Sequence, residues 1–322
     1  IGSSVVSVFY GEIRGNNHAI TNLTNAILFG KFEGKVDGLN MENYNFGAKW
    51  KNGFIDWSTS NPSRNQVAAF ALKATNATFS NMKFTNIVVL GKTSVSAMIL
   101  EDENCTYENI HIEKAYLNGR NFGSQMAAMV AVKTGGSIKN CYVQGEIYGN
   151  AIQNGGVVSL TKGDVTIENV IANMYVSCGS ASNAATWGGF VAKVGDGNLT
   201  VKNSAMIHKL EQNGNPINKF IATVAEGAVA TFQNCYENAE ANGIASDTID
   251  GIKTATHAEL LTKEFYRSKL LLDGNSWNLE NITEEDIRNV DNKVVRFITF
   301  GLTEKQANLQ RAVKQITSSV GL

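Results

Sequence analysis

The sequence feature that most constrains the fold is an asparagine that recurs in a fixed local pattern. Each copy has Thr or Ser, an apolar residue, a polar residue and then the asparagine. The six copies place this asparagine at Asn81, Asn109, Asn140, Asn169, Asn203 and Asn234. Successive copies are separated by 28, 31, 29, 34 and 31 residues. A period of this length is typical of solenoids, in which each turn packs only on its neighbours.

The alternation of apolar residues changes phase at this asparagine. In the first copy the apolar residues are Phe79, two positions before Asn81, and Met82 and Phe84, one and three positions after it. A straight strand has a side-chain period of two and would keep the same phase on both sides. The slip predicts a corner at the asparagine. Asn suits a corner because it adopts left-handed backbone more readily than other non-glycine residues.

The repeat therefore predicts an all-β chain folded as a right-handed parallel β-helix with about eight rungs of about 30 residues each. We assign the corners to Asn22, Gly38, Asn81, Asn109, Asn140, Asn169, Asn203 and Asn234. Corners stacked about 4.8 Å apart would align the amides into a ladder, each bonded to the next, in a stack about 38 Å tall. A β-sandwich or an up-and-down barrel would lack a repeated corner residue.

The spacing between Gly38 and Asn81 is 43 residues, longer than the others. We place the excess in a loop at about residues 47–66, inside a β-helix that covers residues 1–253. The loop carries Trp50, Phe54 and Trp57. Insertions in solenoids often form the binding face, and aromatic side chains suit a sugar or protein contact. The alternative is that these side chains fold back onto the stack as a lid.

Residues 254–322 predict a small C-terminal cap with helices. A short helix is expected over residues 256–265, and Leu270, Leu271, Leu272 and Trp277 are expected to cover the open end of the core. Thr303–Gln306 matches the capping-box motif of a helix N-terminus, and an apolar stripe with helical spacing follows it.

Composition excludes several classes of protein. The formal net charge of −1 lacks the electrostatic footprint of a nucleic-acid binder. No run of 18 apolar residues occurs, so we expect no membrane insertion. The chain opens in mid-pattern at Ile1, and we expect it to be a fragment or a processed product. The four cysteines (Cys105, Cys141, Cys178 and Cys235) show no metal-binding spacing, and we expect buried thiols.

The sequence contains no motif for a metal, a nucleotide or another cofactor, and none of the four histidines lies in an H-E-x-x-H. The best acidic candidates for catalysis are Glu101-Asp102-Glu103 in one turn and Asp164 and Asp196 in neighbouring turns. Glycoside hydrolysis needs two carboxylates roughly 5–10 Å apart, which stacked turns could supply. Acidic turn residues also keep a solenoid soluble. We therefore assign no catalytic residue.

One segment resembles a known family. Residues 11–23, Gly-Glu-Ile-Arg-Gly-Asn-Asn-His-Ala-Ile-Thr-Asn-Leu, followed by Leu28-Phe29-Gly30, resemble the opening of β-helix domains in Gram-positive surface proteins. The repeats resemble GLUG-type modules and the N-terminal region of streptococcal IgA1-specific zinc metalloproteases. Residues 262–266 and 275–278 resemble the end of that region. Arg14 replaces the usual Asp, and Ala68-Ala69 and Ala127-Ala128 replace Gly-Gly.

The resemblance implies a non-catalytic scaffold in an exported, cell-surface bacterial protein, and it carries over no catalytic or metal residue. We expect a substrate-engaging domain that binds a host glycoprotein or a surface glycan, with further domains in the same polypeptide. Two alternatives stay open. One is an adhesin or phage-type receptor-binding protein, and the other is a β-helix enzyme that degrades polysaccharide.

Overall fold

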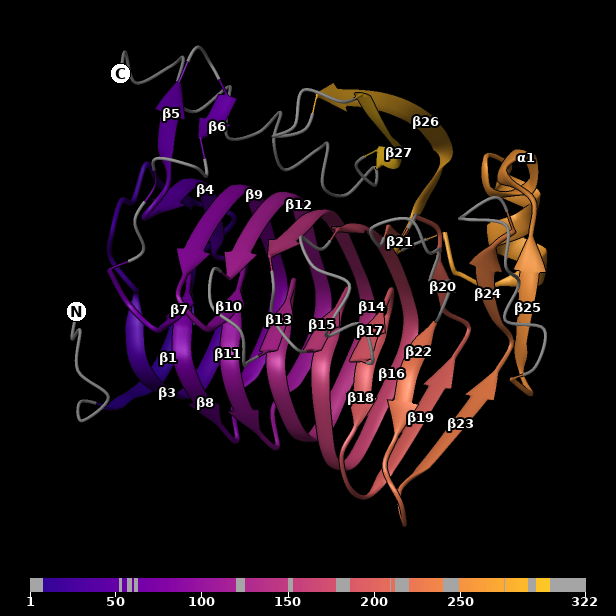
Figure 1. The fold of residues 1–322 in the computed structure, drawn as a ribbon, viewed down its shortest axis with the longest axis horizontal. Helices are drawn as coiled ribbons and strands as arrows, with labels where there is room; N and C mark the ends of the chain where they lie inside the picture. The colour runs from indigo at the N-terminus through magenta and orange to yellow at the C-terminus, as the bar shows by residue number, and fades with distance from the viewer. Residues whose placement is uncertain are drawn as a thin grey trace.

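The computed structural model describes residues 8–51, 54–56, 60, 63–119, 125–149, 153–177, 186–208, 210–211, 220–239, 249–274, 276–288 and 294–301. In this part the chain is predominantly β and coils through successive parallel turns (Figure 1). The alternation read from the sequence appears directly in the burial. In strand β9 (Thr78–Gly91), Phe79, Met82 and Phe84 are buried.

The largest sheet contains 18 of the described strands. The first half comprises β1 (Val8–Arg14), β2 (Ala19–Thr21), β3 (Phe29–Asp37), β4 (Asn40–Phe46), β8 (Ala71–Thr75), β9, β11 (Ile99–Glu103), β12 (Thr106–Gly119) and β14 (Val130–Gly149). The second half comprises β16 (Val158–Ser177), β18 (Val191–Val194), β19 (Asn198–Lys202), β20 (Ala205–Met206), β21 (Leu210–Glu211), β22 (Ile221–Val224), β23 (Val229–Gln233), β24 (Cys235–Asn238) and β25 (Ile252–Ala255).

A second sheet of five short strands closes another side of the coil. It contains β7 (Gln66–Ala68), β10 (Ser94–Ser96), β13 (Gln125–Ala127), β15 (Gln153–Gly155) and β17 (Trp187–Gly188). The chain bends tightly after these strands. A Cβ atom on Gly156 would lie 2.0 Å from the carbonyl oxygen of Gly189 in the next turn. Only glycine allows so close an approach of two backbones, which explains the Gly-Gly pairs.

Parallel pairing brings equivalent repeats into register. Thr78 is opposite Thr106, Thr106 is opposite Ser137, and the pairing continues in this way to Thr231. The six asparagines of the repeat all have positive φ, between 46° and 58°. Gly38, with φ of 67°, precedes them on the same line because Asp37 is opposite Ser80.

Asn22 does not lie on this line, and its assignment to it is wrong. Thr21 is opposite Glu42 and Glu42 is opposite Thr85, so Asn22 lies at a second corner with Asn43 and Asn86. These three also have positive φ, and Asn86 Nδ2 donates to Asn43 Oδ1 at 2.9 Å. Asn suits any left-handed bend, so its presence does not tell one corner from another.

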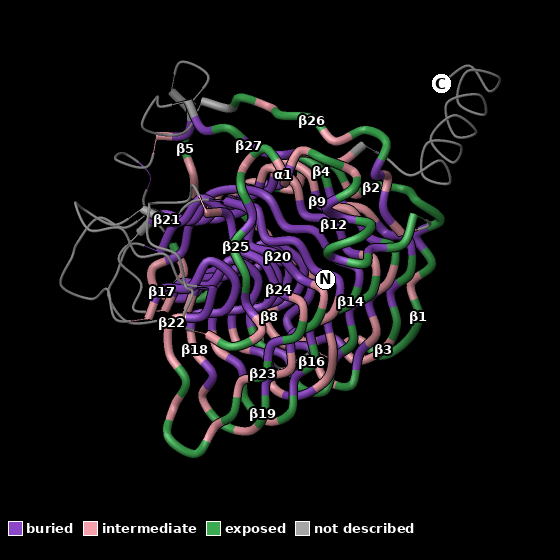
Figure 2. The backbone as a smooth tube through the Cα atoms, turned by 90° about the vertical axis from the view of Figure 1, so that its right-hand side faces the viewer, coloured by how far each residue is buried: buried purple, intermediate pink, exposed green. Residues whose placement is uncertain are grey.

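The interior is filled by apolar side chains from successive turns. Figure 2 shows the backbone of buried residues in purple and that of exposed residues in green. Near the N-terminal end the rings of Phe29, Phe32, Phe70 and Phe79 pack with centroids 5.1 to 5.7 Å apart. Cys105, Cys141 and Cys235 are buried in this core as free thiols, in agreement with the sequence, and Cys178 lies outside the described residues. Burial raises the pKa of Cys141 to about 12, which makes the thiol unreactive.

The C-terminal elements are α1 (His257–Leu260), the π-helical turn η2 (Phe265–Lys269), and the antiparallel hairpin of β26 (Asn278–Arg288) and β27 (Val294–Gly301). The helix expected over residues 256–265 is shorter than predicted, because α1 has four residues and the π-helical turn begins only at Phe265. The N-cap of α1 is Thr256, which forms a capping box with Glu259. The predicted capping box at Thr303–Gln306 lies outside the described residues. We call residues 256–274, 276–288 and 294–301 the clasp.

The clasp covers a lateral face of the stack rather than its open end, so the end-cap prediction needs correction. Leu270, Leu272 and Trp277 are buried, but they pack against the outward side chains of the sheet, including Tyr142 and Ile171. The Trp277 ring lies 5.8 Å from that of His111, which belongs to a turn in the middle of the chain. Figure 1 shows β26 and β27 along one side of the coil.

The β-rich composition and the closed, parallel-strand sheet agree with the predicted fold class. The right-handedness, the count of about eight rungs and the domain boundaries stay predictions.

Candidate functional site

The asparagine corner line is not a continuous amide ladder. Asn109 Nδ2 donates to Asn81 Oδ1 at 2.7 Å, and Asn169 Nδ2 donates to Asn140 Oδ1 at 2.9 Å. Asn234 Nδ2 likewise donates to Asn203 Oδ1 at 3.0 Å. Between these pairs, the buried Oδ1 atoms of Asn109 and Asn169 accept no hydrogen bond. The line therefore divides into short segments.

The outward residues that precede the corners form two parallel rows, which we call the threonine face. The first row contains Thr78, Thr106, Ser137, Thr166, Thr200 and Thr231, and the second contains Ser80, Glu108, Lys139, Glu168, Lys202 and Gln233. All twelve residues are exposed or half-buried. The backbones of neighbouring strands are about 4.8 Å apart. The Thr106 hydroxyl donates to the Thr78 hydroxyl at 3.3 Å along the first row.

The second row of the threonine face alternates in charge. Glu108, Lys139, Glu168 and Lys202 follow one another in register. Lys139 Nζ lies 3.6 Å from the carboxylate of Glu168. Opposite charges on neighbouring strands favour this register by a fraction of a kcal/mol, roughly 0.2–1 kcal/mol. The hydroxyls beside them can each donate or accept a hydrogen bond.

The aromatic loop residues are only partly placed. Trp50 lies in β5 (Lys49–Lys51) and Phe54 in β6 (Phe54–Asp56), two strands that pair antiparallel. The side chains of Trp50 and Phe54, and the whole of Trp57, lie outside the described residues. Their proposed binding role stays a prediction.

Of the acidic candidates for catalysis, Asp164 and Asp196 are exposed in two neighbouring turns, and Asp102 is not part of that surface. Asp164 Oδ1 accepts from the backbone N–H of Asn198 at 3.2 Å, and Asp196 Oδ1 accepts from that of Gly163 at 2.6 Å. Both carboxylates therefore stabilise turns. Asp102 is turned into the interior, whereas Glu101 and Glu103 on either side are exposed.

Asp102 forms a buried ion pair that the sequence reasoning missed. Lys133 Nζ lies 3.0 Å from Asp102 Oδ2, and both side chains have no exposed area. The two residues are directly opposite each other in β11 and β14. Alternation gave no signal for it, because Val130 is buried in the core three positions before Lys133, and a period of two would place Lys133 on the opposite face.

Further polar groups surround this pair. Tyr107 donates its hydroxyl to Asp102 Oδ2 at 2.7 Å, and the backbone N–H of Thr134 donates to Oδ1 at 3.1 Å. Lys133 Nζ also donates to the carbonyl of Cys105 at 2.9 Å and lies 4.8 Å from the centre of the Tyr107 ring. Burial raises the pKa of Asp102, against the opposing effect of Lys133.

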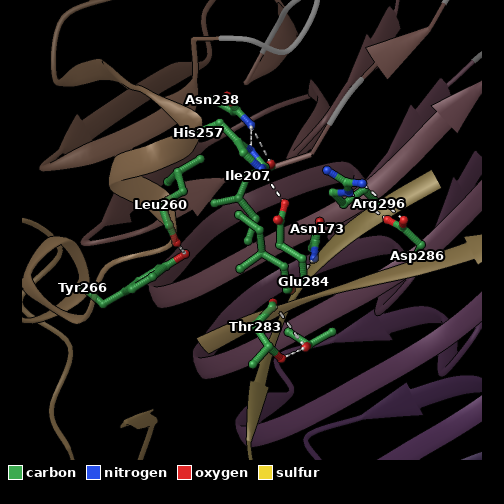
Figure 3. A network of polar contacts seen from close by, with 12 residues as sticks. Asn173, Ile207, Asn238, His257, Leu260, Tyr266, Thr283, Glu284, Asp286 and Arg296 are labelled. Carbon is green, nitrogen blue, oxygen red and sulfur yellow. Dashed lines mark hydrogen bonds and ion pairs between the residues drawn. The ribbon is translucent and has the colours of Figure 1, made fainter. Parts of the chain in front are cut away.

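The clasp is attached to the stack by a polar network, shown in Figure 3. The carbonyl of Ile298 in β27 accepts from the Tyr142 hydroxyl at 2.8 Å and from Asn173 Nδ2 at 2.7 Å. His257 Nε2 lies 2.7 Å from Glu284, which joins α1 to β26. The Tyr266 hydroxyl donates to the carbonyl of Leu260 at 2.7 Å and fixes the turn after α1.

Acidic residues of β26 pair with cations from several elements. Glu280 pairs with Lys263 and Arg267, Glu285 with Lys114, and Asp286 with Arg296. Each pair is exposed to solvent, which screens the attraction, so each contributes little to stability. Lys114 occupies the second corner after Asn86, also with positive φ, and its ammonium lies 2.8 Å from Glu285.

Within the described residues, no group of three His, Cys, Asp or Glu side chains is arranged to hold a metal ion. No helix in the same residues is both long enough and apolar enough to cross a membrane.

The fold and these contacts define a class of protein: a predominantly β chain whose parallel strands close around an apolar core, with a lateral clasp. No family model and no curated protein sequence matches the chain. One solved structure that resembles it is that of an IgA1 protease, at 16% sequence identity and a TM-score of 0.49. The similarity covers 72% of this chain and 18% of that one, so the chain spans less than a fifth of that protein.

Proposed function

We propose that this chain is a non-catalytic binding domain of an exported bacterial surface protein. It would form the N-terminal, substrate-engaging part of an IgA1-protease-like metallopeptidase and bind an extended segment of a host glycoprotein. The residues of the opening motif and the repeats support the family. The observation that carries the binding role is the threonine face.

The threonine face suits an extended ligand for a physical reason. Its hydroxyls repeat along the stack at a spacing set by the backbone, beside a row of charges of alternating sign. A peptide or glycan laid along the stack would meet a donor or acceptor at every turn. The residues are held by inward neighbours such as Tyr107, Ile138 and Ile167, which are fully buried. A rigid surface loses little entropy on binding.

The positions of the carboxylates favour binding over hydrolysis. A glycoside hydrolase needs two carboxylates on either side of a sugar. Asp102 is enclosed in the core, and Asp164 and Asp196 are used by turns. The alternative of a carbohydrate-binding adhesin uses the same surface and differs only in the ligand.

Binding to the threonine face can be tested with lysine substitutions. Human IgA1, intact or enzymatically deglycosylated, would be immobilised and the full chain applied by biolayer interferometry. Thr106→Lys with Thr166→Lys should weaken binding by about tenfold or more, about 1.4 kcal/mol. Thr21→Lys is the matched control, because Thr21 is also an exposed strand threonine and lies outside the face.

A glycan array run with the same variants separates the alternatives. Binding to isolated glycans without binding to IgA1 would favour the adhesin. Release of reducing sugar from a bound polysaccharide would favour the enzyme. Equal binding of IgA1 by the control and the double variant would exclude the threonine face as the site.

A further inference from the structure

The polar cluster inside the core contains the components of a condensation reaction. Lys133 provides an amine and Asp102 a carboxyl group, and their side chains are in contact with no exposed area. Burial of such a pair costs several kcal/mol per ion before the attraction is counted, and apolar replacements are often as stable. The pair therefore needs an explanation beyond packing.

We propose that Asp102 and Lys133 condense into an intramolecular amide that joins neighbouring turns of the stack. The amide would link β11 to β14, since the two residues are opposite each other in register.

The two carboxylate oxygens of Asp102 are held differently, as such a reaction requires. Oδ1 faces the backbone N–H of Thr134 at 3.1 Å, in a position to stabilise negative charge on that oxygen. Oδ2 faces the hydroxyl of Tyr107 at 2.7 Å and Nζ of Lys133 at 3.0 Å, so it is the oxygen that can be protonated and lost.

The reaction starts with the transfer of one ammonium proton from Lys133 Nζ to Asp102 Oδ2. This gives a neutral amine beside a neutral carboxylic acid. Burial disfavours the charged carboxylate of Asp102, because the low dielectric of the interior penalises charge. The raised pKa of Asp102 has the same cause.

The nitrogen of Lys133 then attacks Cγ of Asp102. A C–N bond forms, and the electron pair of the carbonyl moves to Oδ1. Tyr107 gives its proton to Oδ2, the C–Oδ2 bond breaks, and Oδ2 leaves as water while the carbonyl re-forms at Oδ1. The Tyr107 oxygen recovers a proton from the new amide nitrogen. The sum is one acid and one amine giving one amide and one water, with no oxidant or cofactor.

Thr161 provides a second, independent observation. It lies next to Lys133 on the same inward row of the sheet. Its hydroxyl is buried and has no hydrogen-bond partner. An unused acceptor beside the amine can accept a hydrogen bond from an N–H of Lys133 or hydrogen-bond the water that is released.

The intact mass of the purified full chain tests the proposal directly. The expected mass is lower than the sequence mass by one water molecule. Trypsin should fail to cleave after Lys133, because an acylated lysine is not a substrate, and tandem mass spectrometry should find a peptide branched at Asp102 and Lys133. The Lys133→Met variant should have the full mass calculated from its own sequence, with no loss of water.

Two controls make the result specific. Lys139→Met changes an exposed lysine of the same strand and should keep the loss of water. Tyr107→Phe removes only the hydroxyl and should slow or abolish the loss. Cyclisation at an Asp-Gly pair such as Asp37-Gly38 also removes water, but it leaves cleavage after Lys133 intact. The wild-type chain alone tests the proposal, even if a variant does not fold. A wild-type mass equal to the sequence mass would overturn the proposal. A loss of water without the branched peptide would overturn it as well.

Discussion

The interruption of the asparagine line makes a quantitative prediction about coupling between corners. Asn140 accepts a hydrogen bond from Asn169 at 2.9 Å, whereas Asn109 Oδ1 accepts none. Replacing Asn140 by Ala removes one hydrogen bond, worth about 1 kcal/mol, and leaves a side chain that favours left-handed backbone less. The backbone term is roughly 1–2 kcal/mol. The single substitution should therefore cost about 2–3 kcal/mol.

A double-mutant cycle separates the free energy of the hydrogen bond from the backbone cost of each substitution. The backbone cost of a substitution is the same in the single and the double variant, so it cancels in the coupling energy. Asn140→Ala combined with Asn169→Ala should give a coupling energy of about 1 kcal/mol. Asn109→Ala combined with Asn140→Ala should give a coupling close to zero. Urea unfolding followed by circular dichroism measures both. Equal couplings in the two pairs would mean a continuous ladder and would refute the segmented one.

Three further predictions concern burial, the clasp and the loop. Burial lowers the pKa of His111 to about 4, so the unfolded chain binds more protons than the folded one between about pH 4 and 6.5. The free energy of unfolding should therefore fall by up to about 3 kcal/mol as the pH drops through that window. Urea titrations at a series of pH values measure this, and the His111→Gln variant should not show the pH dependence. Tyr142→Phe removes a donor to Ile298 and should cost about 1 kcal/mol in thermal unfolding, and no change would show that the aromatic packing alone holds the clasp. Trp50→Ala with Trp57→Ala should weaken partner binding at unchanged melting temperature, whereas a fall of several degrees without selective loss of binding would favour the lid.

Local sequence contained the signal for the threonine face, although the site predicted from the sequence was the loop with Trp50, Phe54 and Trp57. The threonine rows follow from the repeat, because residues one and three positions before each corner asparagine point outward once the phase is known. The loop aromatics were identifiable only as an interruption of the period. Their side-chain positions depend on the loop backbone, which no repeat specifies.

The polar cluster at Asp102 and Lys133 shows the limit of that reasoning. A period of two counted from the core residues Ile99 and Val130 would place both charged residues on the outward side, where charges are ordinary. Their distance of 31 residues in the chain becomes direct contact only through the register of successive turns. Register is decided by the packing of the whole core, which single-strand periodicity does not contain.

The sequence by itself determined the parallel stack and the line of repeat asparagines at its corners, because both depend on local chemistry repeated at a fixed period. The tertiary structure decided which corner Asn22 joins, where the amide line is interrupted, and that Trp277 covers a lateral face beside His111. Asparagine fits every left-handed corner equally well, and an apolar side chain can be buried on any apolar surface. Which corner and which surface depends on contacts between residues far apart in the chain, and only the folded arrangement provides them.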